Sequence, residues 1–267
     1  MARSTTSMAC ITLEVLFFFG VIILDVLMYE LVYLREGGTK PFKRGFFCND
    51  QDIMKPYRTE RLSFAGILAA GTVLSLVMIL FIELEMHFKK RREKSNDSED
   101  RNKVGPVSIH AGIIRMLHRM GIFGAGMAVL LLFCQVVAIL AGRLRPHFLA
   151  VCKPNTTLYN CSSGYITRDV CTGDPLLVKR ARLSFPSLHT AASAYSLVFV
   201  AICLQAVACL KNNQILRLIL QGVLILFAMA TGLSRISRYY HHWSDVVGGL
   251  VLGAVMARVV VCYNAIL

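Results

Sequence analysis

Charged residues are almost absent from six long apolar stretches of this 267-residue sequence. A soluble domain of this length interrupts its apolar runs more often, so their absence argues against a soluble protein. The sequence also lacks Cys and His at the spacing of a zinc site. It shows no interleaving of basic and aromatic residues typical of a nucleic-acid-binding module. We therefore expect no nucleic-acid partner, although Lys and Arg number 29 against 16 Asp and Glu and the formal net charge is +13.

Apolar residues make up 55% of the sequence, and its mean hydropathy is +0.57. A membrane-spanning helix needs roughly 17–25 predominantly apolar residues. Six stretches meet this length, and they cover about residues 8–34, 63–86, 121–140, 190–210, 215–233 and 246–267. The basic residues are then interpreted as flanks of membrane helices. The sequence predicts an all-α protein in which residues 1–267 form a single membrane domain, a six-transmembrane-helix bundle.

Two connections between the predicted spans differ in composition. Residues 88–103, FKKRREKSNDSEDRNK, form a dense charge run that predicts a solvated loop. Residues 143–189 form the longest polar connection and contain N-glycosylation acceptors at Asn155 (NTT) and Asn160 (NCS). Glycosylation places this second loop on the extracellular or lumenal side. The parity of six spans then places both termini and the charged loop in the cytoplasm, in agreement with the positive-inside rule.

The nine cysteines divide between these regions. Four lie in predicted outer loops, where disulfides persist: Cys48, Cys152, Cys161 and Cys171. We expect one bridge among the last three, although the pairing cannot be deduced from the sequence. Five lie in predicted spans and are expected to be small buried apolar residues: Cys10, Cys134, Cys203, Cys209 and Cys262.

Three polar segments are expected at the outer membrane surface. GRLRPHF (Gly142–Phe148) and SFPSLHT (Ser184–Thr190) border the long outer loop, and SRISRYYHHWSD (Ser234–Asp245) joins the last two predicted spans. The membrane places the three segments at one depth, whereas only helix packing brings them together laterally. Arg145 and Arg235 offer planar forks of donors that suit phosphate oxygens.

The other polar residues of these segments fit phosphoryl transfer. Ser187 and His189 lie at the expected N-terminus of the fourth span, where backbone N–H groups favour an anion. His241 and Asp245 are four positions apart, so on a helical turn the carboxylate would hold one imidazole nitrogen and leave the other as a nucleophile. His189 would protonate a leaving alkoxide. Phosphoryl transfer needs chiefly positioning and charge stabilisation, so these groups require no metal.

Several of these residues also have simpler interpretations. Single basic residues at span ends are more often interfacial anchors: Arg143, Arg238 and His242. Aromatic residues of the third segment fit an interfacial belt: Tyr239, Tyr240 and Trp243. Gly249 and Gly253 have the spacing of a helix–helix contact. Asp25, within the first span, is either functional or a satisfied internal polar residue.

The polar segments resemble the three signature motifs of the type 2 phosphatidic acid phosphatases, also called lipid phosphate phosphatases. The stretches that carry the resemblance are RLRPHFLAVC, SFPSLHT and GLSRISRYYHHWSDV, and KRGFFCND (Lys43–Asp50) is similar to the family's first outer loop. The likeness extends from about Lys40 to Val259. It implies a helical bundle related to the vanadium haloperoxidases. It also implies hydrolysis of phosphatidate, lysophosphatidate, ceramide 1-phosphate or sphingosine 1-phosphate without a metal or other cofactor.

The resemblance also implies residue roles. His241 would be the nucleophile and form a phosphohistidine, Asp245 would orient it, and His189 would protonate the departing lipid hydroxyl. Water would then hydrolyse the phosphoenzyme. The resemblance assigns the phosphate-binding positions as follows: Arg145, Arg235, Ser187 and Leu188. The expected protein is an integral phosphatase of the plasma membrane, with its active site on the extracellular or lumenal side; a homo-oligomer is left open.

Two positions depart from the family pattern. The first motif begins with Lys seven positions before the arginine of Arg-Pro, and here that position is Ala138. The second motif reads Pro-Ser-Gly-His, and Leu188 replaces the glycine that lets the backbone approach the phosphate. Related plasticity-type proteins also lose both residues, but they lack catalytic histidines as well. The sequence therefore predicts a weakened enzyme. The alternatives are a pseudophosphatase that binds phospholipid or a partner, and a transporter or scaffold, which the complete His–Asp spacing disfavours.

Overall fold

The computed structural model describes residues 16, 19–35, 38–59, 63–96, 106–207, 210 and 213–266. The described residues are mostly helical and contain no strand, only two isolated bridges that join residues 46 and 166 and residues 154 and 171. The predicted all-α class is confirmed.

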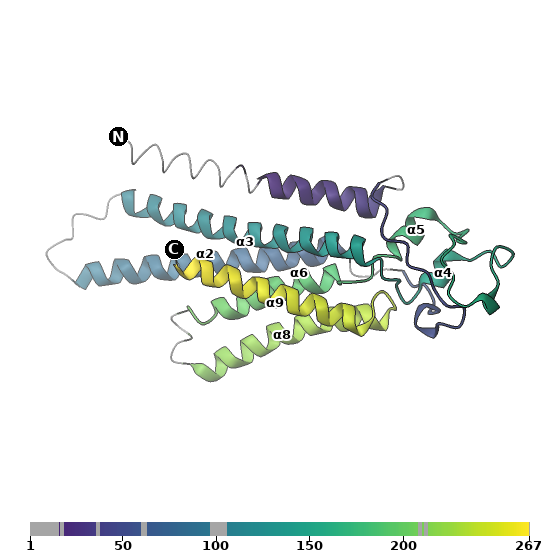
Figure 1. The fold of residues 1–267 in the computed structure, drawn as a ribbon. Helices are drawn as coiled ribbons and strands as arrows, with labels where there is room; N and C mark the ends of the chain where they lie inside the picture. The colour runs from purple at the N-terminus through teal and green to yellow at the C-terminus, as the bar shows by residue number, and fades with distance from the viewer. Residues whose placement is uncertain are drawn as a thin grey trace.

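The long helices lie along one common direction (Figure 1). They are α2 (Phe64–Asn96), α3 (Pro106–Ala141), α6 (Leu188–Cys203), α8 (Gln214–Ser237) and α9 (Trp243–Ile266). A further helix over residues 19–29 continues into the π-helix η1 (Glu30–Leu34). The short helices α4 (Phe148–Cys152) and α5 (Pro175–Arg180) lie together at one end of the bundle. The C-terminal end of α2 and the N-terminal end of α3 lie at the opposite end (Figure 1).

Four described helices are long and apolar enough to cross a membrane, and they contain the windows Phe64–Lys89, Gly112–Ala141, Gln214–Ser237 and Trp243–Tyr263. The protein is therefore an integral membrane protein. Helix α6 has 16 residues, and parts of the first and fourth predicted spans lie outside the described residues. The count of six spans thus stays a prediction.

The predicted charged loop begins later than its composition indicates. Helix α2 continues through residues 88–96, and residues 97–103 lie outside the described residues. Lys, Arg and Glu are good helix formers, so a run of them at the end of an established helix extends it at little cost.

Helix α6 lies at the centre and packs against α2, α8 and α9. The approach of α9 depends on two glycines. A Cβ atom on Gly249 would lie 2.7 Å from the carbonyl oxygen of Ser187, and one on Gly253 would clash with the carbonyl oxygen of Ala191. The predicted helix contact is confirmed, and only the absence of a side chain permits it.

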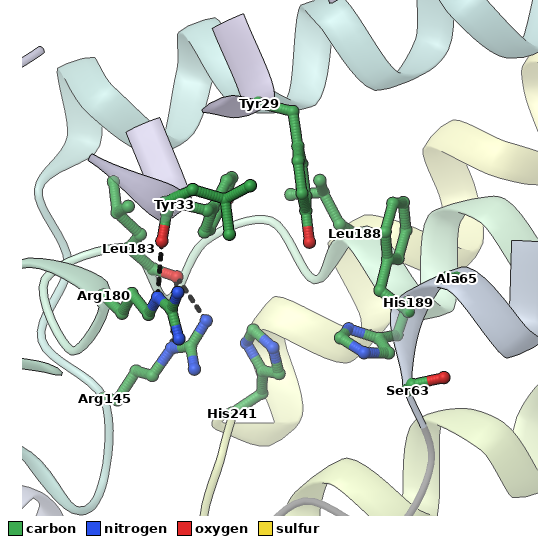
Figure 2. Close-up of a pocket in the computed structure, with 12 residues that line it drawn as sticks. Tyr29, Tyr33, Ser63, Ala65, Arg145, Arg180, Leu183, Leu188, His189 and His241 are labelled. Atoms are coloured by element: carbon green, nitrogen blue, oxygen red, sulfur yellow. Dashed lines mark hydrogen bonds between the residues drawn. The ribbon is translucent and has the colours of Figure 1, made fainter. Parts of the chain in front are cut away.

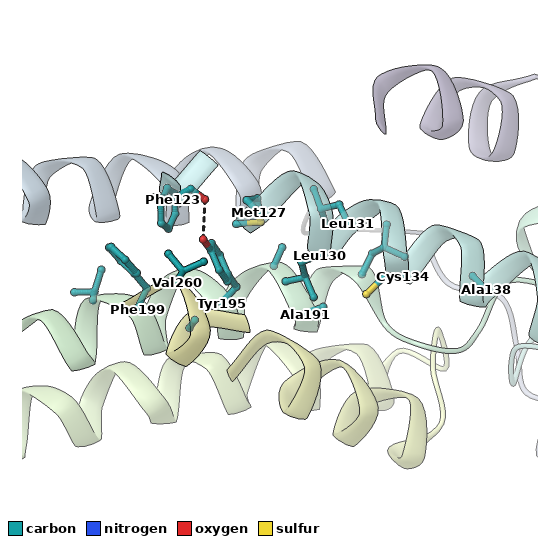
Figure 3. Packing of buried hydrophobic residues seen from close by; sticks show 14 of the residues in the cluster. Phe123, Met127, Leu130, Leu131, Cys134, Ala138, Ala191, Tyr195, Phe199 and Val260 are labelled. Carbon is teal, nitrogen blue, oxygen red and sulfur yellow. Dashed lines mark hydrogen bonds between the residues drawn. The ribbon is translucent and has the colours of Figure 1, made fainter. Parts of the chain in front are cut away.

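The main apolar core lies between α3, α6 and α9 (Figure 3). Phe123, Tyr195 and Phe199 pack within it, and the Tyr195 hydroxyl donates a hydrogen bond of 2.7 Å to the Phe123 carbonyl. Ala138 belongs to the same cluster and is 0% exposed. The position at which the family pattern has lysine is therefore sealed in apolar packing.

Residues 38–59 and 143–187 fold against each other, and we call this region the outer cap. Disulfides join Cys48 to Cys161 and Cys152 to Cys171. The expected bridge among the last three cysteines is confirmed as Cys152–Cys171. The pairing with Cys48 is additional, and it ties the two cap segments together.

The cap also has an apolar core of its own, which includes Phe46, Phe148 and Val170. Of the span cysteines, Cys134 is buried as expected, whereas Cys262 is exposed on α9; Cys10 and Cys209 lie outside the described residues.

Candidate active site

A cavity of about 280 Å³ lies where the first helix, α2, the outer cap, α6 and the α8–α9 connection meet (Figure 2). Twelve residues line it: Tyr29, Tyr33, Leu34, Ser63, Phe64, Ala65, Arg145, Arg180, Leu183, Leu188, His189 and His241. These twelve described residues include two guanidinium groups and two imidazoles, and no carboxylate. Such a set suits an anion.

Four of the seven predicted catalytic and phosphate-binding residues meet in this cavity: His241, His189, Arg145 and Leu188. The other three are not among its lining residues and are each 0% exposed: Asp245, Ser187 and Arg235. The three polar segments therefore converge laterally. The roles assigned to their residues stay predictions.

The carbonyl oxygen of Ser184 orients His241. The distance from His241 Nδ1 to this oxygen is 2.7 Å. A carbonyl oxygen only accepts hydrogen bonds, so Nδ1 carries the proton and Nε2 keeps its lone pair. Burial, and secondarily the charge of Arg145, hold the pKa of His241 well below its ordinary value of 6.5. The ring is thus neutral near pH 7, as a nucleophile must be.

Asp245 does not contact His241 in the way that the four-residue spacing predicts. Its Oδ2 lies 3.9 Å from His241 Nδ1. The reason is that α9 begins only at Trp243, so the two residues do not share a helical face. Oδ2 instead accepts hydrogen bonds from Ser184 Oγ at 2.6 Å and from the His242 backbone N–H at 2.9 Å. Ser184 therefore links the two residues, because its hydroxyl bonds Asp245 and its carbonyl bonds His241.

Arg143 is a partner of this carboxylate and not an isolated interfacial anchor. Its Nη1 lies 2.7 Å from Asp245 Oδ1 and 2.7 Å from Ser244 Oγ. His242 Nδ1 also approaches Asp245 Oδ2, at 3.2 Å. By contrast, Arg238 bonds weakly to the exposed Thr59 carbonyl, as an anchor would. Arg143 lies two positions before Arg145, and that proximity to the first motif is the only sequence signal of its role.

Tyr240 is wrongly predicted as part of an aromatic belt. It is 5% exposed, and its ring lies 5.7 Å from the Arg145 guanidinium and 5.9 Å from that of Arg235. The ring therefore makes cation–π contacts with both guanidinium groups. Trp243, 70% exposed, fits the belt. The sequence alone cannot rank neighbouring aromatic residues by burial.

Ser187 is buried outside the cavity lining, and its polar groups form hydrogen bonds within the protein. Its Oγ shares a hydrogen bond of 2.9 Å with Thr190 Oγ1, and its backbone N–H donates to the Asp245 carbonyl at 3.1 Å. Ser187 is 0% exposed and is not among the residues that line the cavity, so its contact with a bound phosphate stays a prediction.

Leu188 lines the cavity as the first residue of α6. Its backbone is helical, so φ is negative and leucine introduces no backbone strain there. Its side chain is 7% exposed and also packs in the main core. Leu188 thus narrows the cavity without distorting the chain.

Two further polar residues, Asp25 and His147, lie outside the cavity. Asp25 accepts a hydrogen bond from the Gln135 side chain, which fits a satisfied internal polar residue. His147 lies in the outer cap, and its Nδ1 is 2.7 Å from the Tyr239 carbonyl oxygen. Within the described ranges, no group of three His, Cys, Asp or Glu side chains is arranged to hold a metal ion.

Comparison with known proteins identifies the family of this chain. Residues 119–266 match the PAP2 superfamily. Phospholipid phosphatase 1 of Rattus norvegicus is 39% identical over 226 residues, which is 84% of this chain and 76% of the relative. Phospholipid phosphatase 2 of Homo sapiens is 38% identical over 223 residues, 84% of this chain and 74% of the relative. No solved structure gives a significant match. The chain, with a histidine-lined cavity at the disulfide-bonded end of its bundle, belongs to the PAP2 superfamily.

Proposed function

We propose that this protein is an integral membrane lipid phosphate phosphatase. Its substrates would be phosphomonoesters such as phosphatidate, lysophosphatidate, sphingosine 1-phosphate or ceramide 1-phosphate. One observation carries the proposal: His241, with its Nδ1 proton held by the Ser184 carbonyl, lines the same cavity as His189 and Arg145. The names of the relatives, phospholipid phosphatases 1 and 2, support it.

The chemistry follows from this arrangement. His241 Nε2 attacks the phosphorus and forms a P–N bond, while the P–O bond to the lipid breaks. His189 gives its proton to the departing alkoxide. Arg145 stabilises the charge on the nonbridging oxygens. Water, deprotonated by His189, then attacks the phosphorus, the P–N bond breaks, and inorganic phosphate leaves.

The hydrogen-bond chain behind His241 supports the positive ring of the intermediate. The Ser184 carbonyl accepts from Nδ1–H, and the Asp245 carboxylate, held by Arg143, lies 3.9 Å from the same nitrogen. A carboxylate at this distance favours a positive imidazole electrostatically.

The proposed location is the plasma membrane, with the cavity on the extracellular or lumenal side. The cavity lies at the same end of the bundle as the disulfide-bonded outer cap, and disulfides persist outside the cytoplasm. A lipid in the outer leaflet would present its phosphate at this level.

Hydrolysis is tested with membranes that express the chain, given lysophosphatidate in the presence of a chelator. We expect phosphate release by the parent and its loss in His241→Ala. The matched control is His118→Ala, because His118 is exposed on the N-terminal part of α3, far from the cavity. Equal release from the parent and His241→Ala would refute the proposal.

The pseudophosphatase alternative predicts a different pattern. Under that alternative the parent releases no phosphate, and Ala138→Lys combined with Leu188→Gly restores release. A parent that is active, and more active with Leu188→Gly per folded molecule, fits an enzyme that Leu188 restrains by narrowing its cavity.

A further inference from the structure

Arg180 is the charged cavity residue that comes from outside the three polar segments. It lies at the C-terminal end of α5 in the outer cap. Its Nε donates a hydrogen bond of 2.6 Å to the Tyr33 carbonyl at the end of the first helix. This is the only hydrogen bond of its side chain among the residues that the structure describes. Figure 2 shows its guanidinium directed into the cavity beside that of Arg145.

The charged groups that the structure places around Arg180 are mainly cationic. Among the described residues that line the cavity there is no carboxylate, and the nearby Asp245 is 0% exposed and paired with Arg143 at 2.7 Å. Two guanidinium groups that face one small, partly enclosed space repel each other. An anion bound against both groups would offset this repulsion, and a phosphate has enough oxygens to accept hydrogen bonds from both.

We propose that Arg180 is a further phosphate-binding residue, which contacts a second nonbridging oxygen next to the one that Arg145 contacts. The inference rests on the proposed function and deepens it. Arg180 would supply a cation from the outer cap in a chain whose position 138 is an alanine sealed in the core. Because Tyr33 holds Arg180, the first helix becomes part of the phosphate site.

A structural role for Arg180 makes a different prediction, and its neighbour Lys179 separates the two. Lys179 Nζ donates to the carbonyls of Leu31 at 2.6 Å and Arg35 at 2.9 Å, so it also fastens the end of the first helix. Lys179 is not among the residues that line the cavity. If these side chains act only by holding the end of the first helix, substitutions at positions 179 and 180 should have similar effects. If Arg180 also contacts phosphate, only substitutions at position 180 should weaken phosphate binding.

The test measures binding of inorganic phosphate to the purified full-length protein, by calorimetry or by the phosphate-dependent rise in its unfolding temperature. We expect Arg180→Gln to weaken phosphate binding about 10- to 100-fold, the scale of one charge-assisted hydrogen bond. Arg180→Lys keeps the charge and should lose less. Lys179→Gln should bind phosphate as the parent does. If Arg180→Gln does not fold, the comparison of Arg180→Lys with Lys179→Arg decides, because a charge-retaining change should weaken binding only at position 180.

Three results would overturn the inference: no phosphate binding by the parent, unchanged binding by Arg180→Gln, or equal weakening in Lys179→Gln. Hydrolysis of lysophosphatidate is measured separately. Normal turnover with Arg180-independent phosphate binding would refute this inference and leave the proposed function intact. Arg180-dependent phosphate binding without turnover would support the inference and refute hydrolysis.

Discussion

His147 shows how a single residue of the outer cap couples the stability of the protein to pH. Its ring lies 5.2 Å from that of Tyr57 and 5.1 Å from that of Tyr240, and it is 3% exposed. Burial, and then the neighbouring Arg145 charge, lower the pKa of His147 from 6.5 to about 4. The folded protein therefore resists protonation of this ring.

We predict that the stability of His147→Gln falls less steeply than that of the parent as the pH is lowered. Between pH 6.5 and about 4 the unfolded chain protonates His147 and the folded protein does not, so stability falls as the pH falls through this window. The contribution lost is about 3 kcal/mol at the acid end. The check is the unfolding temperature of both proteins across the window. An equally steep decline in His147→Gln would contradict the assignment, whatever the stability of the variant at neutral pH.

For single residues, the sequence predicts which residues belong to the site better than it predicts which partners they contact. Pattern and chemistry identify His241, His189 and Arg145, and the structure brings them to one cavity. The partner of His241 is a backbone carbonyl, which carries no side-chain signal. Arg180 escapes prediction because it lies in the cap, where no motif or periodicity marks it.

Among the contacts between helices, the one between α6 and α9 determines where the residues around His241 lie. Gly249 of α9 faces the carbonyl of Ser187, the N-cap of α6, and the Cβ of Thr190 in the first turn of α6. Asp245 lies one turn earlier on α9 and bonds Ser184 just before α6. The separation of these helices therefore sets the position of the oriented histidine.

We predict that Gly249→Ala destabilises the protein by about 1–3 kcal/mol, the range for overpacking a tight contact. The new Cβ would lie 2.7 Å from the Ser187 carbonyl oxygen and 3.1 Å from Thr190 Cβ. Thermal unfolding and phosphate release should both decline. The matched control is Gly222→Ala on α8, because a Cβ there meets no atom within 4 Å. Equal effects of the two substitutions would argue against the contact.

Apolar runs predict the presence of the long helices, but not their ends. Helix α2 extends over residues 88–96, which composition assigns to a loop, because helix propagation tolerates a charged segment. Helix α6 is also shorter than its apolar run, since the chain turns after Cys203. The spacing of Gly249 and Gly253 predicts a contact, whereas the partner helix is visible only in the structure.

For the whole molecule, the two ends of the bundle differ in chemistry. The outer cap carries the two disulfides of the described residues and the acceptors Asn155 and Asn160, and the basic end of α2 lies opposite (Figure 1). The side-chain oxygens of Asn155 and Asn160 accept hydrogen bonds from the backbone N–H groups of Thr157 and Ser162. The sequence predicts this polarity from its acceptors, but not the Cys48–Cys161 link, because pairing depends on how loops meet.

We predict that the protein is glycosylated in the outer cap. Treatment with a glycosidase should lower the apparent mass of the wild type and leave the mass of Asn155→Gln/Asn160→Gln unchanged. Each single variant assigns the sugar to its asparagine. A wild type whose mass does not shift would remove the principal support for an outward-facing cavity.

The Ser184 carbonyl has a consequence for how this site is studied. Alanine scanning changes side chains, and Ser184→Ala would keep the oxygen that fixes the His241 tautomer while removing only the hydroxyl bond to Asp245. A survey of that kind would attribute the orientation of His241 to no residue at all. Backbone editing would expose it: an ester in place of the amide that follows Ser184 makes the oxygen a poorer acceptor and leaves every side chain untouched.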